Sequence, residues 1–240
     1  MEIDKNIRII GMALYLIKEK AVVISDLHLG LEEALNKQGY LIPLQQFKDI
    51  NDRLKKIFDE NEVNEVIFNG DVKHEFGTIL NSEWSNITRI FELVSNYCEK
   101  IVIIKGNHDM LLEPIARKMN IIIQDYCKIN EYFISHGDKI IDNLEFQAAK
   151  TIIISNEHTA ISLRKGGRKE LYKCFLVGKF KDKTLIAMPS FNTLTEGTDV
   201  LNGGLLSPML QQDLGEFQVY IAADKIYDFG KVKDIKNMIN

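Results

Sequence analysis

The segment AVVISDLHLG, at residues 21–30, joins an apolar run to polar residues that can carry chemistry. Its first five residues are almost uniformly apolar, as expected of a β-strand buried on both faces of a parallel sheet. Asp26 and His28 follow this strand directly. The same arrangement recurs along the chain, and its alternation with longer helical segments predicts an α/β fold.

Further strands and helices are predicted on both sides of this segment. Apolar runs at 65–69, 101–105, 132–135 and 151–155 are expected to join 21–25 at the centre of a sheet. Helical spacing of apolar residues predicts amphipathic crossover helices at 44–61 and 82–98. Residues 6–10 and 12–17 predict a strand meander before the first run. Later strands are expected at 171–177, 184–188, 217–222 and 225–229, the last two as a hairpin.

The composition excludes several classes of protein. The chain has 240 residues, of which 45% are hydrophobic, and it contains no Pro-, Gly- or Ser-rich linker, so a single domain over residues 1–240 with two packed sheets is expected. A net charge of −4 means that any phosphate-binding surface is local. Three scattered cysteines form no disulfide framework, which favours a reducing, cytoplasmic location. No apolar run approaches the roughly 20 residues of a membrane span.

Each of the five apolar strands is followed by a potential metal ligand. Four of the five histidines in the chain lie in these loops, whereas histidines without a shared role would be scattered. Because carboxyl ends of parallel strands converge on one crevice, these side chains are expected to meet there. The residues at the strand ends are Asp26, His28, Asp71, Asn107, His108, Asp109, His136 and His158.

The donor types indicate which metal such a site would bind. Carboxylates, imidazoles and an amide oxygen suit Mn²⁺, Fe or Zn²⁺ rather than Ca²⁺ or a cysteine-held zinc. A central carboxylate such as Asp71 can bridge two ions about 3.5–4 Å apart, the spacing used for displacement at phosphorus. Each short motif taken alone is also a common turn or cap, so the argument depends on their joint occurrence.

The motif series resembles that of the calcineurin-like metallophosphoesterases, which runs DxH, GDxx, GNHD, a lone His before Gly, and GHxH. A narrower resemblance points to archaeal and bacterial predicted phosphoesterases that include DNA-ligase- and helicase-associated proteins. The stretches DLHLGLEEAL with the following GYLIPLQQ, GDVKHEF and PSFNTLTEGTDV carry it, so the resemblance covers nearly the whole chain. It implies a four-layer α/β/β/α sandwich of two packed mixed sheets, with a dinuclear site at one sheet edge.

The resemblance also implies roles for individual residues. Two divalent ions are expected, with Mn²⁺ as the first choice and Fe, Zn²⁺ or Mg²⁺ as alternatives. His108 matches the catalytic histidine, which would stabilise the pentavalent transition state or protonate the leaving oxygen, and Asp109 would orient it. Asp71 matches the bridging carboxylate. The remaining ligands are Asp26, His28 and His158 for the first metal, and Asn107 and His136 for the second.

One position departs from the family pattern. The GHxH motif reads SNEH here, so Asn156 stands where the other histidine of the second metal belongs. An amide oxygen is a poorer donor to a borderline transition metal than an imidazole nitrogen, which predicts a weakly held second ion. The adjacent Glu157 offers a replacement carboxylate, but alternation along an extended chain directs its side chain the other way.

Three further segments leave alternatives open. Lys73 and His74 either contact a substrate phosphate at the rim of the site or belong to a solvated loop anchored by Phe76. The segment 189–200 either contributes backbone contacts near the metals or is a turn-rich connector. Residues 160–183 contain eight basic and two acidic residues, and form either a nucleic-acid track or a solvated hairpin. In the first reading Arg164 and Arg168 bind phosphate, and Gly166 and Gly167 let the loop bend around it.

These observations predict a metal-dependent phosphoesterase. It would act by direct attack of a hydroxide activated by two metals, without a covalent enzyme intermediate. The expected substrate is a phosphodiester, such as a nucleic acid or nucleotide, with no membrane partner. A phosphomonoesterase is the enzymatic alternative, and a non-catalytic scaffold with a weakened second site is the other. Asn156 favours the scaffold, whereas His108 and Asp109 favour the enzyme. The oligomeric state does not follow from the sequence.

Overall fold

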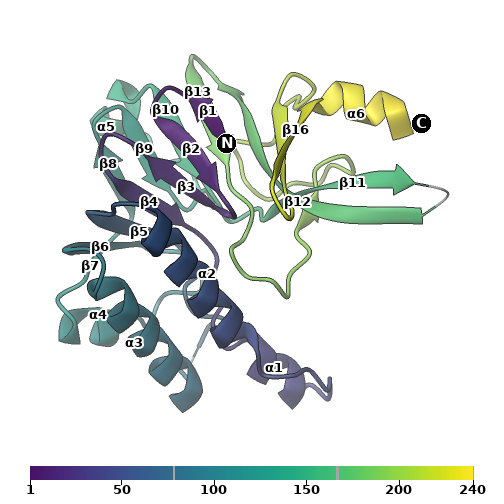
Figure 1. Ribbon diagram of the computed structural model, residues 1–240. Helices are drawn as coiled ribbons and strands as arrows, with labels where there is room; N and C mark the ends of the chain where they lie inside the picture. The colour runs from purple at the N-terminus through teal and green to yellow at the C-terminus, as the bar shows by residue number, and fades with distance from the viewer. Residues whose placement is uncertain (78, 166–167, 240) are drawn as a thin grey trace. The chain divides into compact units, whose positions relative to one another are not determined.

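Two mixed β-sheets, each with its own helices, form the structure (Figure 1). The computed structural model describes residues 1–77, 79–165 and 168–239. Its contacts divide the chain into two units: unit 1 is Met1–Asp125 with Phe191–Leu194, and unit 2 is Tyr126–Ser190 with Thr195–Asn240. The predicted α/β class with two mixed sheets is confirmed, and the single domain stays a prediction.

Unit 1 contains a seven-stranded sheet whose strands follow one another in chain order. The strands are β1 (Glu2–Asp4), β2 (Ile7–Ile10), β3 (Ala13–Leu16), β4 (Ala21–Ile24), β5 (Glu65–Asn69), β6 (Lys100–Ile104) and β7 (Ile122–Gln124). The helices are α1 (Leu31–Lys37), α2 (Gln46–Glu60), α3 (Asn81–Ser95) and α4 (Glu113–Lys118). The first four strands pair antiparallel, whereas β4 to β7 are parallel.

The parallel half of this sheet is fixed by helices that pack on one of its faces. Helices α2, α3 and α4 lie on the same side of β4 to β7 (Figure 1). Ile50 and Leu54 of α2 and Phe91 of α3 are fully buried and share one apolar cluster with Ile24 and Phe68 of the sheet. Burial of one such side chain contributes about 1.5–3 kcal/mol, so the strand ends are held firmly.

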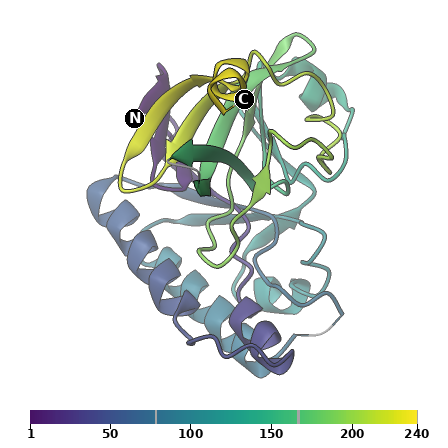
Figure 2. The same cartoon turned by 90° about the vertical axis from the view of Figure 1, so that its right-hand side faces the viewer.

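Unit 2 contains a nine-stranded sheet with two helices. Its strands are β8 (Tyr126–Ile129), β9 (Tyr132–Ser135), β10 (Thr151–Ile154), β11 (Thr159–Lys165), β12 (Arg168–Phe180), β13 (Lys183–Ala187), β14 (Thr198–Asp199), β15 (Gln218–Ala222) and β16 (Ile226–Lys231). The helices are α5 (Leu144–Ala148) and α6 (Val232–Ile239). Figure 2 shows α6 beside β16, and β11 with β12 forms a long antiparallel hairpin. No helix among the described residues is long and apolar enough to span a membrane.

Both predicted helices and the predicted strands are observed, whereas the shorter helices α1, α4, α5 and α6 were not predicted. The predicted helices correspond to α2 and α3, and the predicted C-terminal hairpin is β15 with β16. One expectation is wrong: the five apolar runs do not share one sheet. β4, β5 and β6 belong to unit 1, whereas β9 and β10 pair in parallel in unit 2. An apolar run shows that a strand is buried but not which strand it pairs with.

Candidate metal centre

The loops that follow β4 and β5 run side by side as a continuation of the sheet. Ile24 is paired with Phe68 at the ends of the two strands. Beyond them, the N–H of Asp26 donates to the Gly70 carbonyl at 3.0 Å, and the N–H of His28 donates to the Asp71 carbonyl at 2.9 Å. Backbone hydrogen bonds therefore fix the predicted ligands of both loops relative to each other.

The backbone of these loops is strained at the predicted ligands. The φ angles of Asp26, His28 and Asp71 are 51°, 44° and 50°, a left-handed region that side chains other than glycine rarely adopt. In unit 2, Asn156 and His158 have φ angles of 63° and 51°. Such residues cost on the order of 1–3 kcal/mol each and cluster at functional sites. The left-handed backbone turns these side chains away from the directions that they would take in a continuing extended strand.

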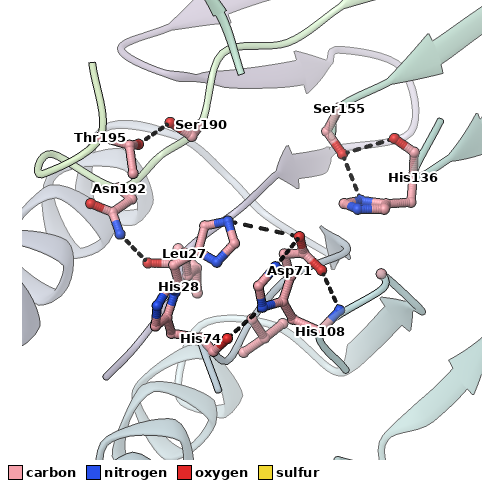
Figure 3. Close-up of polar contacts among 12 residues, drawn as sticks. Leu27, His28, Asp71, His74, His108, His136, Ser155, Ser190, Asn192 and Thr195 are labelled. Carbon is pink, nitrogen blue, oxygen red and sulfur yellow. Dashed lines mark hydrogen bonds and ion pairs between the residues drawn. The ribbon is translucent and has the colours of Figure 1, made fainter. Parts of the chain in front are cut away.

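Two carboxyl groups and an imidazole meet within unit 1. A ligand atom from each of Asp26, His28 and Asp71 lies within 4.8 Å of the others, and the exposed fractions of these residues are 0%, 4% and 2%. Figure 3 shows His28 pointing at Asp71, with 3.7 Å between Nε2 and Oδ2. Buried carboxylates this close repel each other unless a cation lies between them. This oxygen and nitrogen donor set fits a divalent transition metal.

His108 lies beside this group, from the loop after β6. Its backbone N–H donates to Asp71 Oδ1 at 2.9 Å, and its Nε2 lies 3.8 Å from Asp71 Oδ2. Its Nδ1 is hydrogen-bonded to the main-chain carbonyl of His74 (Figure 3). A carbonyl oxygen only accepts, so Nδ1 carries the proton of that bond. The ring therefore presents Nε2 towards Asp71.

Asp109 acts on the backbone of the same loops. Its carboxyl oxygens accept hydrogen bonds from the N–H groups of Val72 at 3.0 Å, Lys73 at 3.4 Å and Gly106 at 3.1 Å. The sequence analysis expected Asp109 to orient the His108 ring, but the Nδ1 bond of that ring goes to His74 instead. Asp109 thus ties the loop after β5 to the loop after β6.

His74 brings a third imidazole to the site. Ligand atoms of His28, His74 and His108 lie within 4.8 Å of one another. Burial, followed by the nearby His108, lowers the pKa of His74, which favours its neutral, metal-binding form. The neighbouring Lys73 is fully buried. This burial disagrees with both expectations for Lys73, a position at the rim of the site and a position in a solvated loop.

Asn107, another predicted ligand, is exposed in the loop after β6 in unit 1. The other predicted ligands lie in unit 2, after the neighbouring strands β9 and β10. His136 is 1% exposed, and its Nδ1 lies 3.1 Å from Ser155 Oγ (Figure 3). Asn156 and His158 follow Ser155 and are partly buried. Glu157 Oε2 accepts from the backbone N–H groups of residues 206 and 207, at 2.7 and 2.9 Å. The carboxyl group of Glu157 is thus directed to that loop, as alternation along the chain predicts.

Two residues that the sequence analysis missed support the loop after β4. Gln46, the first residue of α2, donates from Nε2 to the carbonyls of Leu27 and His28 at 3.0 and 2.8 Å. Asn192 donates from Nδ2 to the Leu27 carbonyl at 3.0 Å (Figure 3). The segment 189–200 also makes the expected backbone contacts: the N–H of Phe191 donates to the Ser25 carbonyl at 2.9 Å, and that of Asn192 to the Asp26 carbonyl at 3.3 Å. A buried amide on the apolar face of a predicted helix was the available signal for Gln46.

The basic segment of unit 2 forms the β11–β12 hairpin. Arg164 and Arg168 are exposed near its tip, while Gly166 and Gly167 lie outside the described residues. Other basic residues of the segment have structural partners. Lys169 Nζ lies 3.0 Å from Asp199 Oδ2, Lys173 Nζ donates to Ser190, and the buried Lys183 donates to the carbonyls of Gln147 and Ala149. Lys179 and Lys181 are exposed at the other end of β12, whereas Arg164 and Arg168 place exposed positive charge near the tip.

Comparisons with known proteins place these features in context. The sequence profile described as calcineurin-like phosphoesterase matches residues 20–215. No curated protein sequence matches the chain. The structure of the nuclease MPE from Pseudomonas putida aligns at 17% identity over 91% of this chain and 92% of that one, with a TM-score of 0.66. At this identity the likeness shows a shared fold.

Two further solved structures align over similar lengths with lower scores. A predicted phosphoesterase from Streptococcus pneumoniae TIGR4 has 13% identity, covers 88% of this chain and 97% of its own, and gives a TM-score of 0.34. Wild-type Vps29 complexed with zinc from Entamoeba histolytica has 13% identity, covers 88% and 99%, and gives 0.36. Both structures therefore superpose on this chain less closely than the nuclease does.

Gly106 provides a test of this geometry. A Cβ at this position would lie 2.2 Å from Asp71 Oδ1 and 2.4 Å from the Asp71 backbone nitrogen, so Gly106→Ala must displace Asp71. We expect a loss of about 1–3 kcal/mol in the free energy of unfolding, and at least tenfold weaker Mn²⁺ binding measured by calorimetry. Gly77→Ala is the control, because its Cβ would meet no atom within 4 Å. Unchanged Mn²⁺ affinity in Gly106→Ala would show that the position of Asp71 does not matter for metal binding.

Proposed function

This chain belongs to the calcineurin-like phosphoesterase family, and we propose that it is a metal-dependent phosphodiesterase that acts on nucleic acid or nucleotides. The observation that carries the proposal is the buried group of Asp26, His28 and Asp71 with His108 beside it. A binding module has no need for buried, mutually repelling carboxyl groups on strained backbone.

We assign two divalent ions to the protein, with Mn²⁺ first and Fe, Zn²⁺ or Mg²⁺ as alternatives. Bound ions of this kind supply Lewis acidity, which activates water and offsets the charge of the phosphoryl oxygens. Asp71 would hold both ions. The other proposed ligands are Asp26, His28 and Asn107 in unit 1, and His136, Asn156 and His158 in unit 2.

His108 supplies the proton that the leaving group of the ester needs. Because the His74 carbonyl holds the Nδ1 proton of His108, any proton that His108 delivers leaves from Nε2. We propose that it goes to the departing oxygen of the ester while water attacks phosphorus, with no covalent enzyme intermediate. Asp109 keeps the two supporting loops together through its backbone hydrogen bonds.

Two observations support a diester substrate, and nucleic acid in particular. The protein from Pseudomonas putida with the same fold is a nuclease, and Arg164 and Arg168 are exposed near the tip of the β11–β12 hairpin. Phosphate contacts from such arginines give affinity without reading sequence. A phosphomonoesterase is the enzymatic alternative. Asn156, with its poorer donor, favours the second alternative, a non-catalytic scaffold. A cytoplasmic location stays a prediction from the cysteine content.

The proposal is tested by removing metal and then the proton donor. Protein stripped with a chelator should hydrolyse bis(p-nitrophenyl) phosphate only after Mn²⁺ is restored, and faster than p-nitrophenyl phosphate. His108→Ala should keep its bound Mn²⁺ but lose turnover of an oligonucleotide, whose leaving alkoxide needs a proton, by about 10²-fold or more. Hydrolysis that resists the chelator would contradict the metal dependence, and loss of Mn²⁺ from His108→Ala would make His108 a ligand.

Asn156 gives a second test. Asn156→His restores the ligand type of the family motif and should tighten binding of the weaker Mn²⁺ ion by about tenfold, because imidazole is the better donor. Titration of the metal-free protein, monitored by calorimetry, measures both binding constants. If the weaker constant does not change, Asn156 lies outside the metal shell.

The hairpin tip gives a third test. The double variant Arg164→Ala and Arg168→Ala should raise the KM for a single-stranded oligonucleotide and flatten its salt dependence, while leaving bis(p-nitrophenyl) phosphate unaffected. The charge-matched control is Lys55→Ala with Lys56→Ala, two exposed residues of α2. Equal effects of the arginine variant on both substrates, or an equal effect of the lysine control on the oligonucleotide, would remove the argument for a nucleic-acid track.

A further inference from the structure

The loop between Lys73 and α3 contacts the His108 ring at two points. The carbonyl of His74 accepts the bond from Nδ1, and the ring of Phe76 lies against the imidazole with 3.6 Å between centroids and a tilt of 32°. Phe76 itself is 56% exposed, so packing of its own side chain does not fix the loop. The orientation of His108 therefore depends on whatever holds this loop in place.

Glu83, in the first turn of α3, holds both ends of the loop. Its Oε1 accepts from the backbone N–H of Glu75 at 3.1 Å and from that of His74 at 3.3 Å, which also donates to the Leu29 carbonyl at 3.0 Å. Its Oε2 accepts from the backbone N–H of Leu80 at 2.9 Å. The side chain is fully buried, with an exposed fraction of 0%. One carboxyl group thus accepts hydrogen bonds from backbone donors at both ends of the loop.

The loop after β4 is shaped to receive Glu83. Gly30 has a φ of 99°, and a Cβ on this residue would lie 2.4 Å from Glu83 Cγ and 2.6 Å from its Oε1. Only glycine combines this backbone conformation with the space that the side chain occupies. Glu83 therefore packs against the loop that carries His28 while it binds the loop that contacts His108.

We infer that Glu83 is a positioning residue for His108. The inference rests on the proposed function, in which His108 delivers a proton from Nε2. A helix-capping role explains only the Leu80 bond, because a glutamate at the third helical position commonly reaches back to the residue before the helix. The bonds to His74 and Glu75 lie outside that role, and they fix the carbonyl that holds the Nδ1 proton.

Glu83→Gln removes the clamp with little change in volume. An amide has one accepting oxygen where the carboxyl group has two, so one end of the loop loses its partner and faces an N–H donor instead. The His74 carbonyl then keeps only the support of the His74 N–H bond to Leu29, and the direction of His108 Nε2 becomes less defined. Asp26, His28 and Asp71 keep their positions, so bound Mn²⁺ should be unchanged.

The leaving group of the substrate separates positioning from a structural role. A p-nitrophenolate leaves without a proton, whereas a nucleoside alkoxide needs one. For Glu83→Gln we expect kcat for an oligonucleotide to fall by at least about tenfold, while kcat for bis(p-nitrophenyl) phosphate changes by less than about twofold. Glu92→Gln makes the same chemical change at an exposed position of α3 and should alter neither. When His108→Ala is already present, adding Glu83→Gln should not lower kcat for the oligonucleotide further, because both changes impair the same proton delivery.

The outcomes that overturn the inference are distinct from those that overturn the proposed function. If the wild type is active and Glu83→Gln lowers kcat equally for both substrates, or no longer binds Mn²⁺, Glu83 is purely structural. A wild-type protein inactive on both esters contradicts the proposed function instead. In that case the nitrogen NMR shifts of His108 still decide: the protonated Nδ1 should be observed in the wild type and lost in the variant. Glu83→Asp, one methylene shorter, replaces Glu83→Gln if the latter fails to fold.

Discussion

Everything at the candidate metal centre depends on keeping two buried carboxyl groups, those of Asp26 and Asp71, close together. Their mutual repulsion in a dry environment and the left-handed backbone on which they stand both oppose folding. The parallel pairing of β4 with β5 and the backbone bonds between their loops resist this cost. Gly106 completes the arrangement by leaving the space that Asp71 occupies.

The surrounding side chains follow from this constraint. Besides the backbone bonds between them, the loops that carry the candidate ligands are held by side chains from other segments. Gln46 and Asn192 bind the carbonyl of Leu27, Asp109 binds the N–H of Val72, and Glu83 binds the N–H of His74. Buried polar groups with several partners each give a rigid site at the end of otherwise regular strands.

The sequence predicts the elements well because their signals are local. The apolar runs of β4, β5 and β6 and the helical spacing of α2 and α3 are each visible within a short window. The ligand candidates are visible too, because chemistry at the ends of parallel strands has a fixed place in the pattern. The division of the strands between two sheets was missed, because it depends on pairing between distant segments.

The supporting residues were missed for a related reason. Glu83 is close to the loop that it holds, but its bonds are to backbone groups, which every residue has, so no residue type in that loop reveals them. Lys73 was expected in a solvated or rim position because lysine is seldom buried, and its burial depends on tertiary packing. Residue types therefore identify the groups that perform chemistry more readily than those that hold them.

Mn²⁺ binding to the Asp71→Asn variant tests the central claim most directly. Titration calorimetry of the metal-free wild type should show two ions, and Asp71→Asn should weaken both, because one carboxyl group supplies charge to each. Asp49→Asn, an exposed change on α2, should leave both binding constants as they are. Two ions bound to Asp71→Asn with wild-type affinity would contradict the account.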